Sequence, residues 1–160
     1  MRIVSEPIRD FSRGVHDYYG RYADNADAKI GALFALNFAV AGLVISHLPE
    51  ACLAAIFSWQ AVVLDAAAGA VLLFGIYPRT PVAHGAETSP IFWGDVAREA
   101  SAQAYAKRVE SLSDADIERA YGTNNYVVAK VLQTKFLAIR VAIWLTAAAL
   151  ASVIASVIAR

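Results

Sequence analysis

DNADAKIGALFALNFAVAGLVISHL, residues 24–48, is the stretch of sequence that decides the fold. It begins with polar and charged residues, and from residue 30 onward it is an apolar run in which only Asn37, Ser46 and His47 have polar side chains. At about 1.5 Å of helical rise per residue the run spans roughly 28 Å, close to the thickness of the hydrocarbon core of a bilayer. The stretch predicts a membrane-spanning helix, with a buried helix of a soluble bundle as the alternative.

The composition of the whole chain favours the membrane interpretation. Of its 160 residues, 58% are hydrophobic and 18% are charged, whereas ordinary soluble domains contain about 25% charged residues. Two further apolar runs, residues 58–77 with 51–57 as an outer extension and residues 136–159, are long enough to cross a bilayer. We therefore expect an all-α membrane protein with three transmembrane helices. The net charge of zero gives no indication of nucleic-acid binding.

The distribution of Lys and Arg predicts the orientation of the chain. Five of these residues precede the first span and seven lie between the second and third spans, whereas the outer turn contains none. By the positive-inside rule both basic regions face the cytoplasm. The predicted parts are a cytoplasmic N-terminal helix at 1–29, a transmembrane hairpin at 30–77, a cytoplasmic helical sensor region at 78–135 and the third span at 136–160. The start of the chain lacks the pattern of a cleavable signal peptide, so we expect it to be retained.

Helical periodicity extends beyond the spans. Apolar residues recur every three or four positions through residues 8–22, so the first helix is predicted to run from near Ser5 into the first span as one rod. A hinge near Asp24 is the alternative. A separate amphipathic helix is predicted from about residue 90 to 112. Residues 113–116, Ser-Asp-Ala-Asp, resemble a capping box and start a helix that continues into the third span.

The pattern of reactive side chains gives no support to catalysis or metal binding. Cys52 is the only cysteine, which excludes an intrachain disulfide and a cysteine metal site. His16, His47 and His84 are dispersed, and the sequence has no His-x-x-x-His pair, no phosphate-binding glycine loop and no Gly-x-Ser-x-Gly elbow. We expect no enzymatic activity, no cofactor and no metal.

Several short motifs resemble those of a known family. Between about residues 23 and 140 they occur in order around the predicted spans, as Asp27-Ala28-Lys29 followed by Leu36-Asn37, Tyr77-Pro78-Arg79, Ile91-Phe92-Trp93-Gly94-Asp95, and Lys135-Phe136 with Arg140. Together they resemble the membrane effectors of bacterial Pycsar antiphage systems, which are paired with a pyrimidine nucleotide cyclase. Residues 27–31, Asp-Ala-Lys-Ile-Gly, depart from the Asp-Asn-Lys-Ala-Ser or similar sequence expected of that family.

The resemblance implies a function and its partners. It implies that the protein senses cyclic CMP or cyclic UMP, impairs the integrity of the bacterial inner membrane and arrests the infected cell by abortive infection. The functional partner would be the cyclase that makes the nucleotide. A ligand-independent membrane scaffold and a holin-like pore protein are the alternatives that the residues leave open.

The region between the second and third spans contains the groups that a cyclic mononucleotide requires. A receptor needs an aromatic or apolar face for the base and one or two cations for the phosphate, and an amide can read the edge of a pyrimidine. For Phe92 the alternative is core packing, and for Arg79 it is a position beside the lipid headgroups. The candidate nucleotide-binding residues are Arg79, Phe92, Trp93, Arg98, Tyr121 and Asn125.

A second set of candidate residues lies in the spans. An ionisable group such as Asp65 costs about 2.5 to 3.5 kcal/mol within a span and must face protein or water. It is predicted either to line a gate or to be a protonated acid that is satisfied by hydrogen bonds between helices. Asn37 and Thr146 are the candidate partners on the other two spans, with Thr146 nearer the depth of Asp65. Asp27 and Lys29 are predicted to form an ion pair where the first helix enters the membrane.

Small residues on the spans predict assembly. Gly31, Ala35 and Ala39 recur four residues apart on the first span, and Ala66 and Ala70 do so on the second. Such patterns allow helix backbones to approach closely in a membrane. Because three spans of one chain are too few to enclose a conducting path, a homo-oligomer is predicted.

Overall fold

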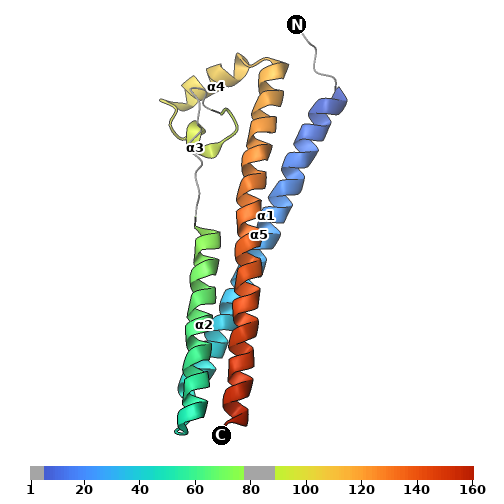
Figure 1. The fold of residues 1–160 in the computed structure, drawn as a ribbon. Helices are drawn as coiled ribbons and strands as arrows, with labels where there is room; N and C mark the ends of the chain where they lie inside the picture. The colour runs from blue at the N-terminus through green and yellow to red at the C-terminus, as the bar shows by residue number, and fades with distance from the viewer. Residues whose placement is uncertain (1–5, 78–88) are drawn as a thin grey trace. The chain divides into compact units, whose positions relative to one another are not determined.

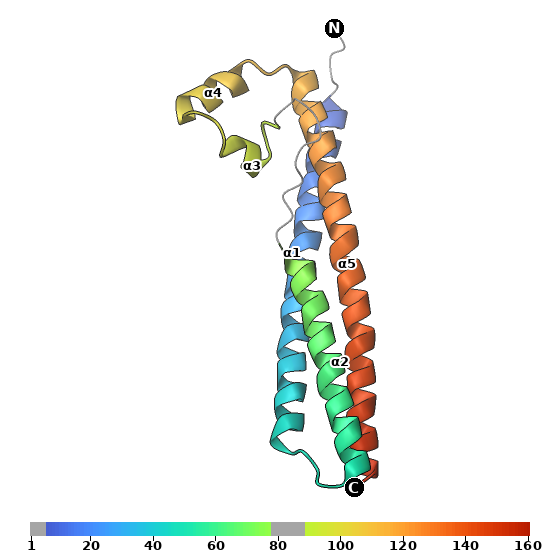
Figure 2. The same cartoon turned by 60° about the vertical axis from the view of Figure 1, so that its left-hand side comes forward.

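The chain forms an all-α fold, drawn in Figures 1 and 2. The computed structural model describes residues 6–77 and 89–160, with side chains from residue 10 onward in the first segment. No strand occurs in these two segments, so the predicted fold class is confirmed. The helices are α1 (Glu6–Ser46), α2 (Cys52–Ile76), α3 (Trp93–Val96), α4 (Ala102–Glu110) and α5 (Asp114–Ile158).

The two longest helices, α1 and α5, are unbroken, which confirms both predicted rods (Figure 1). Helix α1 passes Asp24 without a hinge, and its predicted start near Ser5 lies outside the described residues. Helix α5 begins at the predicted capping box. The amide of Asp116 donates to Ser113 Oγ at 3.3 Å, and the amide of Ser113 donates to Asp116 Oδ2 at 3.0 Å. Each residue thus satisfies a backbone N–H of the other.

Helix α2 starts at Cys52, so the predicted outer extension is helical from that residue and continuous with the span. The helix ends at Ile76, and Tyr77 has a ψ of 122°. A residue before proline is pushed out of the helical region by the proline ring, and residue 78 is proline. The end of this span is therefore fixed by local sequence.

The predicted helix at 90–112 is wrong. The structure has the four-residue α3 and the nine-residue α4 instead, separated by residues 97–101. Ser101 has an extended backbone, with φ of −165° and ψ of 163°, and its Oγ accepts a hydrogen bond from the amide of Ala104 at 3.1 Å. A serine that caps a new helix cannot also continue a preceding one. The apolar periodicity did not reveal this break.

The chain divides into two compact units, which are described separately. The polar unit consists of residues 1–23 and 78–132, of which 6–23 and 89–132 are described. The membrane unit consists of residues 24–77 and 133–160 and contains α2 with the adjoining parts of α1 and α5. In Figures 1 and 2, α2 lies beside both of these helices.

The interior of the membrane unit is built largely from small residues. The inward row of α2 recurs every three or four positions and consists of Ala54, Ser58, Ala61, Asp65, Ala68, Leu72 and Gly75. A Cβ at Gly75 would lie 3.0 Å from Ala138 Cβ and 3.5 Å from Ile30 Cδ1, so the three helices approach closely there. Such packing is typical of helices in lipid, where small residues let backbones come together.

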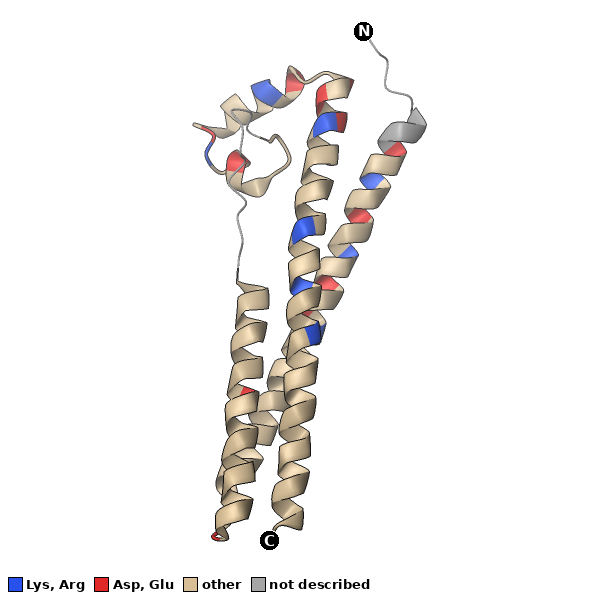
Figure 3. Cartoon of the chain, in the orientation of Figure 1, with Lys and Arg blue, Asp and Glu red and all other residues tan. Residues whose placement is uncertain are grey.

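The exterior of the membrane unit is apolar and carries the large side chains. Phe38 is 68% exposed and Trp144 is 73% exposed, and each of the three helices contains a segment that is long and apolar enough to cross a membrane. Figure 3 shows few charged residues along α2 and along the second half of α5. The protein is therefore a membrane protein with three spans. The small residues Gly31, Ala35, Ala39, Ala66 and Ala70 also lie on this exposed surface.

Candidate functional site

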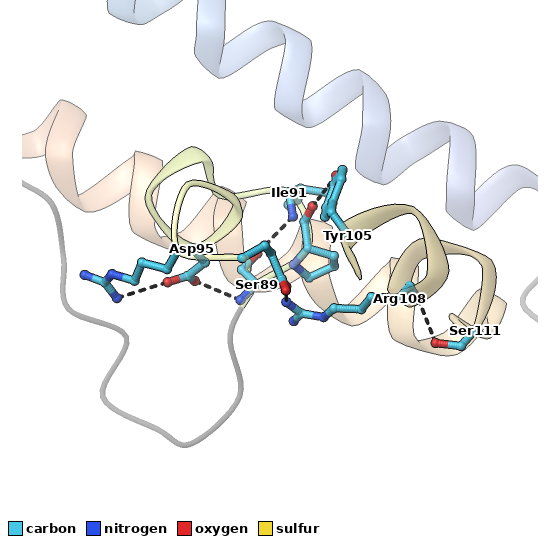
Figure 4. A network of polar contacts seen from close by, with 9 residues as sticks. Ser89, Ile91, Asp95, Tyr105, Arg108 and Ser111 are labelled. Carbon is cyan, nitrogen blue, oxygen red and sulfur yellow. Dashed lines mark hydrogen bonds and ion pairs between the residues drawn. The ribbon is translucent and has the colours of Figure 1, made fainter. Parts of the chain in front are cut away.

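A network of polar contacts around Asp95 holds the segment that contains α3 (Figure 4). Asp95 is buried; its Oδ2 accepts a hydrogen bond from the amide of Ser89 at 2.8 Å, and its Oδ1 accepts one from Arg98 Nη1 at 3.4 Å. The Tyr105 hydroxyl of α4 donates to the carbonyl of Pro90 at 2.9 Å. These contacts fix α3 between the residues that precede it and α4.

Three candidate nucleotide-binding residues lie in this network. The ring of Phe92 covers Gly94, where a Cβ would lie 2.7 Å from Phe92 Cε1, so Phe92 packs against the backbone of α3 and a larger residue at position 94 would displace its ring. Trp93 is 68% exposed, with its ring centroid 5.8 Å from that of Phe92. Arg98 is exposed and bonded to Asp95 through one nitrogen. The exposed face of the Trp93 ring and the N–H groups of Arg98 that do not bond to Asp95 can therefore contact a ligand.

The other two described candidates lie between α1 and α5. Asn125 Nδ2 donates to the carbonyl of Ser12 at 3.1 Å, and the ring of Tyr121 meets that of His16 edge to face at a centroid distance of 5.7 Å. Ser12 Oγ also donates to Glu118 Oε1. Asn124 Nδ2 donates to His16 Nδ1 at 3.2 Å. We call this group, Ser12, His16, Glu118, Tyr121, Asn124 and Asn125, the polar seam.

The structure therefore divides the predicted nucleotide site. Among the described residues, no contact joins Trp93 and Arg98 to Tyr121 and Asn125. Arg79 lies outside the described residues. The seam contains two buried acceptors that have no hydrogen-bond partner in the described part of the chain, Glu118 Oε2 and Asn125 Oδ1. Buried acceptors of this kind are rare and are suited to the N–H groups of a ligand or a water.

Sequence reasoning missed Ser12, His16 and Glu118. Their spacing contained the signal, because Ser12 and His16 lie four residues apart and Glu118, Tyr121 and Asn125 follow at three and four. Residues at such intervals share one helix face. A polar row on each of two helices predicts a polar contact, but only the fold shows that the rows meet.

The capping residue Asp116 at the start of α5 has a shifted pKa. A hydrogen bond of 2.5 Å from the Ser113 hydroxyl and a weaker one from the Ser113 amide lower the pKa of Asp116 below its ordinary value. Both bonds favour the carboxylate over the neutral acid. The cap is therefore strongest when Asp116 is ionised.

The three candidate residues of the spans lie in the interior of the membrane unit. Thr146 Oγ1 donates to Asn37 Oδ1 at 2.8 Å, and both side chains are buried. Thr146 therefore bonds to Asn37. It does not bond to Asp65, although the sequence placed Thr146 closer than Asn37 to the depth of Asp65 in the membrane. Asp65 is 3% exposed, and neither of its carboxylate oxygens has a hydrogen-bond partner in the described segments.

The ion pair at the end of the membrane unit differs from the prediction. Asp27 pairs with Lys135 Nζ of α5 at 2.5 Å, and Lys29 Nζ lies 5.9 Å from the centroid of the Phe136 ring. Residues two apart on a helix do not face each other, so Asp27 and Lys29 meet α5 separately. Both contacts join α1 to α5.

Comparison with known proteins assigns the chain to a family. A family model described as the Pycsar effector protein domain matches residues 11–160. The chain belongs to the Pycsar effector family. No curated protein and no solved structure matches it. This Pycsar effector is accordingly a membrane effector of a Pycsar antiphage system, and its three spans agree with that assignment.

Proposed function

We propose that this Pycsar effector senses a cyclic pyrimidine mononucleotide, cCMP or cUMP, and responds by impairing the integrity of the bacterial inner membrane, which causes abortive infection. The observation that carries the proposal is the family match over residues 11–160, which includes most of the polar unit and all three apolar spans. No chemical step is required of the protein, and we propose that it is not an enzyme. Its functional partner is the pyrimidine nucleotide cyclase that supplies the ligand.

The polar unit offers suitable groups for the ligand. The exposed Trp93 ring supplies a face on which a flat base can stack. Arg98 uses one nitrogen for Asp95, and a guanidinium has five N–H donors, so donors remain for a phosphate. The unpartnered acceptors of Glu118 and Asn125 suit the N–H groups of a pyrimidine. Sites at α3 and at the polar seam are thus the two candidates.

The basic residues support the proposed orientation. Lys and Arg are frequent before the first span and between the second and third spans, and absent from the turn between α1 and α2. The polar unit therefore faces the cytoplasm in our proposal, where the cyclase releases its product. Exposed small residues on α1 and α2 leave room for other copies of the chain, in agreement with a homo-oligomer.

Thermal unfolding of the purified protein in detergent tests the sensing step. The probes are cCMP, cUMP, cAMP and cGMP. At a concentration of 100 Kd a ligand that binds only the folded state adds about 2.7 kcal/mol of stability, so one of the two pyrimidine nucleotides should raise the Tm while the purine nucleotides do not. Trp93→Ala and Arg98→Gln should each reduce that shift if the site is at α3. Arg13→Gln is the matched control, because Arg13 is an exposed arginine on α1.

Leakage from vesicles tests the response. Proteoliposomes that contain the protein should release ions only after the nucleotide that raised the Tm is added. Release without any nucleotide would favour the holin-like alternative. A protein with no Tm shift and no release under any condition would contradict the proposal and favour the scaffold.

A further inference from the structure

A row of polar side chains runs through the interior of the membrane unit. Asn37 and Thr146 bond to each other at 2.8 Å, and Ser58 and Ser156 share another hydrogen bond of 2.8 Å. All the members are at least nine-tenths buried, although the exterior of the same helices is apolar. We call this row the interior polar line; it consists of Asn37, Ser58, Asp65, Thr146, Ser152 and Ser156.

One member of the line has unpaired acceptors and another has an unpaired donor, among the described residues. Asp65 has two acceptor oxygens without a partner, and Asn37 Nδ2 is a donor without one, in the described part of the chain. The carboxylate lies beside the backbone of Ala41, one helical turn beyond Asn37. Leaving such groups unsatisfied in a membrane is costly. Water that bridges Asp65 and Asn37 would satisfy both.

No cation within the bundle neutralises Asp65. Residues 30–46 of α1 contain no charged residue, and Asp65 is the only charge on α2. On the facing part of α5, residues 136–158, the single charge is Arg140, which is exposed. The carboxyl therefore has no fixed counter-ion and can exchange a proton with water instead.

The two ends of the interior polar line have different surroundings, a cavity at one end and apolar side chains at the other. Toward the α1–α2 turn, Ser58 and Ser156 border a cavity of about 110 Å³ that His47 and Arg160 also line. Because a water molecule occupies about 30 Å³ in the liquid, this cavity has room for several. Toward the polar end of the spans, the line meets a buried apolar cluster that includes Ile30, Leu72 and Ile139. One end of the line thus borders a cavity with room for water, and the apolar cluster closes the other end.

We propose that the interior polar line is a proton path, with Asp65 as its relay and the apolar cluster around Leu72 as its gate. When the gate opens, the Asp65 carboxylate accepts a proton from water on one side and releases it to water on the other, so one O–H bond forms as another breaks. A file of water and hydrogen-bonding side chains is enough to carry protons, so this path fits between the three spans of one chain, whereas the open pore expected from the sequence, which would pass solutes, needs several subunits. This inference rests on the proposed function, because it names protons as the species that crosses the membrane when the effector impairs membrane integrity.

Proteoliposomes that carry a trapped pH-sensitive dye, with a potassium-sensitive dye or a larger trapped fluorophore in parallel samples, test the path. With cCMP or cUMP, the wild-type protein should conduct protons well before the larger fluorophore escapes. Asp65→Asn, which keeps the shape of the side chain, should lower proton flux by about tenfold or more. Asp65→Glu should restore part of it. Asp24→Asn, the same change at an exposed position on α1, should leave the flux unchanged.

A gate variant separates this inference from the proposed function. Leu72→Thr places a hydroxyl in the apolar cluster and should conduct protons without nucleotide, and the double variant Asp65→Asn, Leu72→Thr should not. If the wild-type protein is silent with both nucleotides while Leu72→Thr conducts through Asp65, the path stands and the sensing proposal fails. Unchanged proton flux in Asp65→Asn, equal release of protons and fluorophore, or a folded but silent Leu72→Thr would overturn the path.

Discussion

The polar unit and the membrane unit both contain the pairing of α1 with α5, yet the pairing is chemically different in each. In the polar unit the contacts include hydrogen bonds between polar side chains, such as Ser12 with Glu118 and Asn124 with His16. In the membrane unit the same helices pack through small and apolar residues with one buried hydrogen bond between Asn37 and Thr146. One continuous helix can therefore switch, within a few turns, from contacts made by polar side chains to contacts made by small and apolar ones.

The surroundings explain this difference. Water around the polar unit can hydrate the charged outer faces of its helices, so a polar contact there has a modest net effect. Lipid around the membrane unit is as apolar as leucine, so burying large apolar side chains gains little and close packing of small ones holds the helices together. The two units should accordingly respond to different substitutions.

The largest loss of stability is expected from a substitution where the helices of the membrane unit approach closely, at Gly75. Gly75→Leu would place four carbons where even a Cβ lies 3.0 Å from Ala138 Cβ. Overpacking of this kind costs about 1–3 kcal/mol or more, and the Tm in detergent should fall. Gly69→Leu on the same helix is the control, because a Cβ there meets nothing within 4 Å. Equal loss of stability in both variants would show that close packing at Gly75 is not what holds α2.

A smaller effect is expected from breaking the polar seam. Ser12→Ala removes the donor to Glu118 Oε1, and Glu118 Oε2 already has no partner in the described segments. Leaving the carboxyl without a partner should cost about 1 kcal/mol, the lower end of the range for an unmet polar group, because Glu118 is only half-buried. Adding Glu118→Leu should recover part of the loss, because removing both polar partners is far less costly than removing one. Thr123→Ala, an exposed change on α5, is the control. Strictly additive effects of the two substitutions would contradict a direct contact.

The smallest effect is expected at the α5 cap and depends on pH. The Ser113 hydroxyl lowers the pKa of Asp116 in the folded protein, so the cap contributes stability above the ordinary aspartate pKa of about 3.9 and loses it as pH falls through the folded value. Asp116→Asn should therefore lower the Tm slightly at neutral pH, and the difference from wild type should disappear in acid. A difference that persists at the lowest pH would assign the effect to the amide side chain instead.

Features determined by local sequence could be predicted. The apolar run at 30–48 predicted the first span, and Ser113 with Asp116 predicted the start of α5. The resemblance carried by short motifs predicted the family. The span and the cap are each encoded by residues close together in the chain, and the family resemblance by several short local motifs in a fixed order.

Features that depend on contacts between distant segments could not be predicted. Asp27 pairs with a lysine 108 positions away, and Asn125 with a carbonyl 113 positions away. Thr146 is 109 positions from Asn37. The prediction of one helix at 90–112 was wrong because the Ser101 hydroxyl caps the N-terminus of a new helix, α4. The spacing of apolar residues contains no information about such a cap. The nucleotide-binding residues remain predictions.

The unbroken length of α5 has a mechanical consequence. Its 45 residues give about 68 Å of helix at 1.5 Å per residue, roughly twice the hydrocarbon thickness of a bilayer. No loop interrupts the helix between its polar first half and its apolar second half. A rotation of one half about the helix axis is therefore carried into the other half, because no flexible residues lie between them to absorb it.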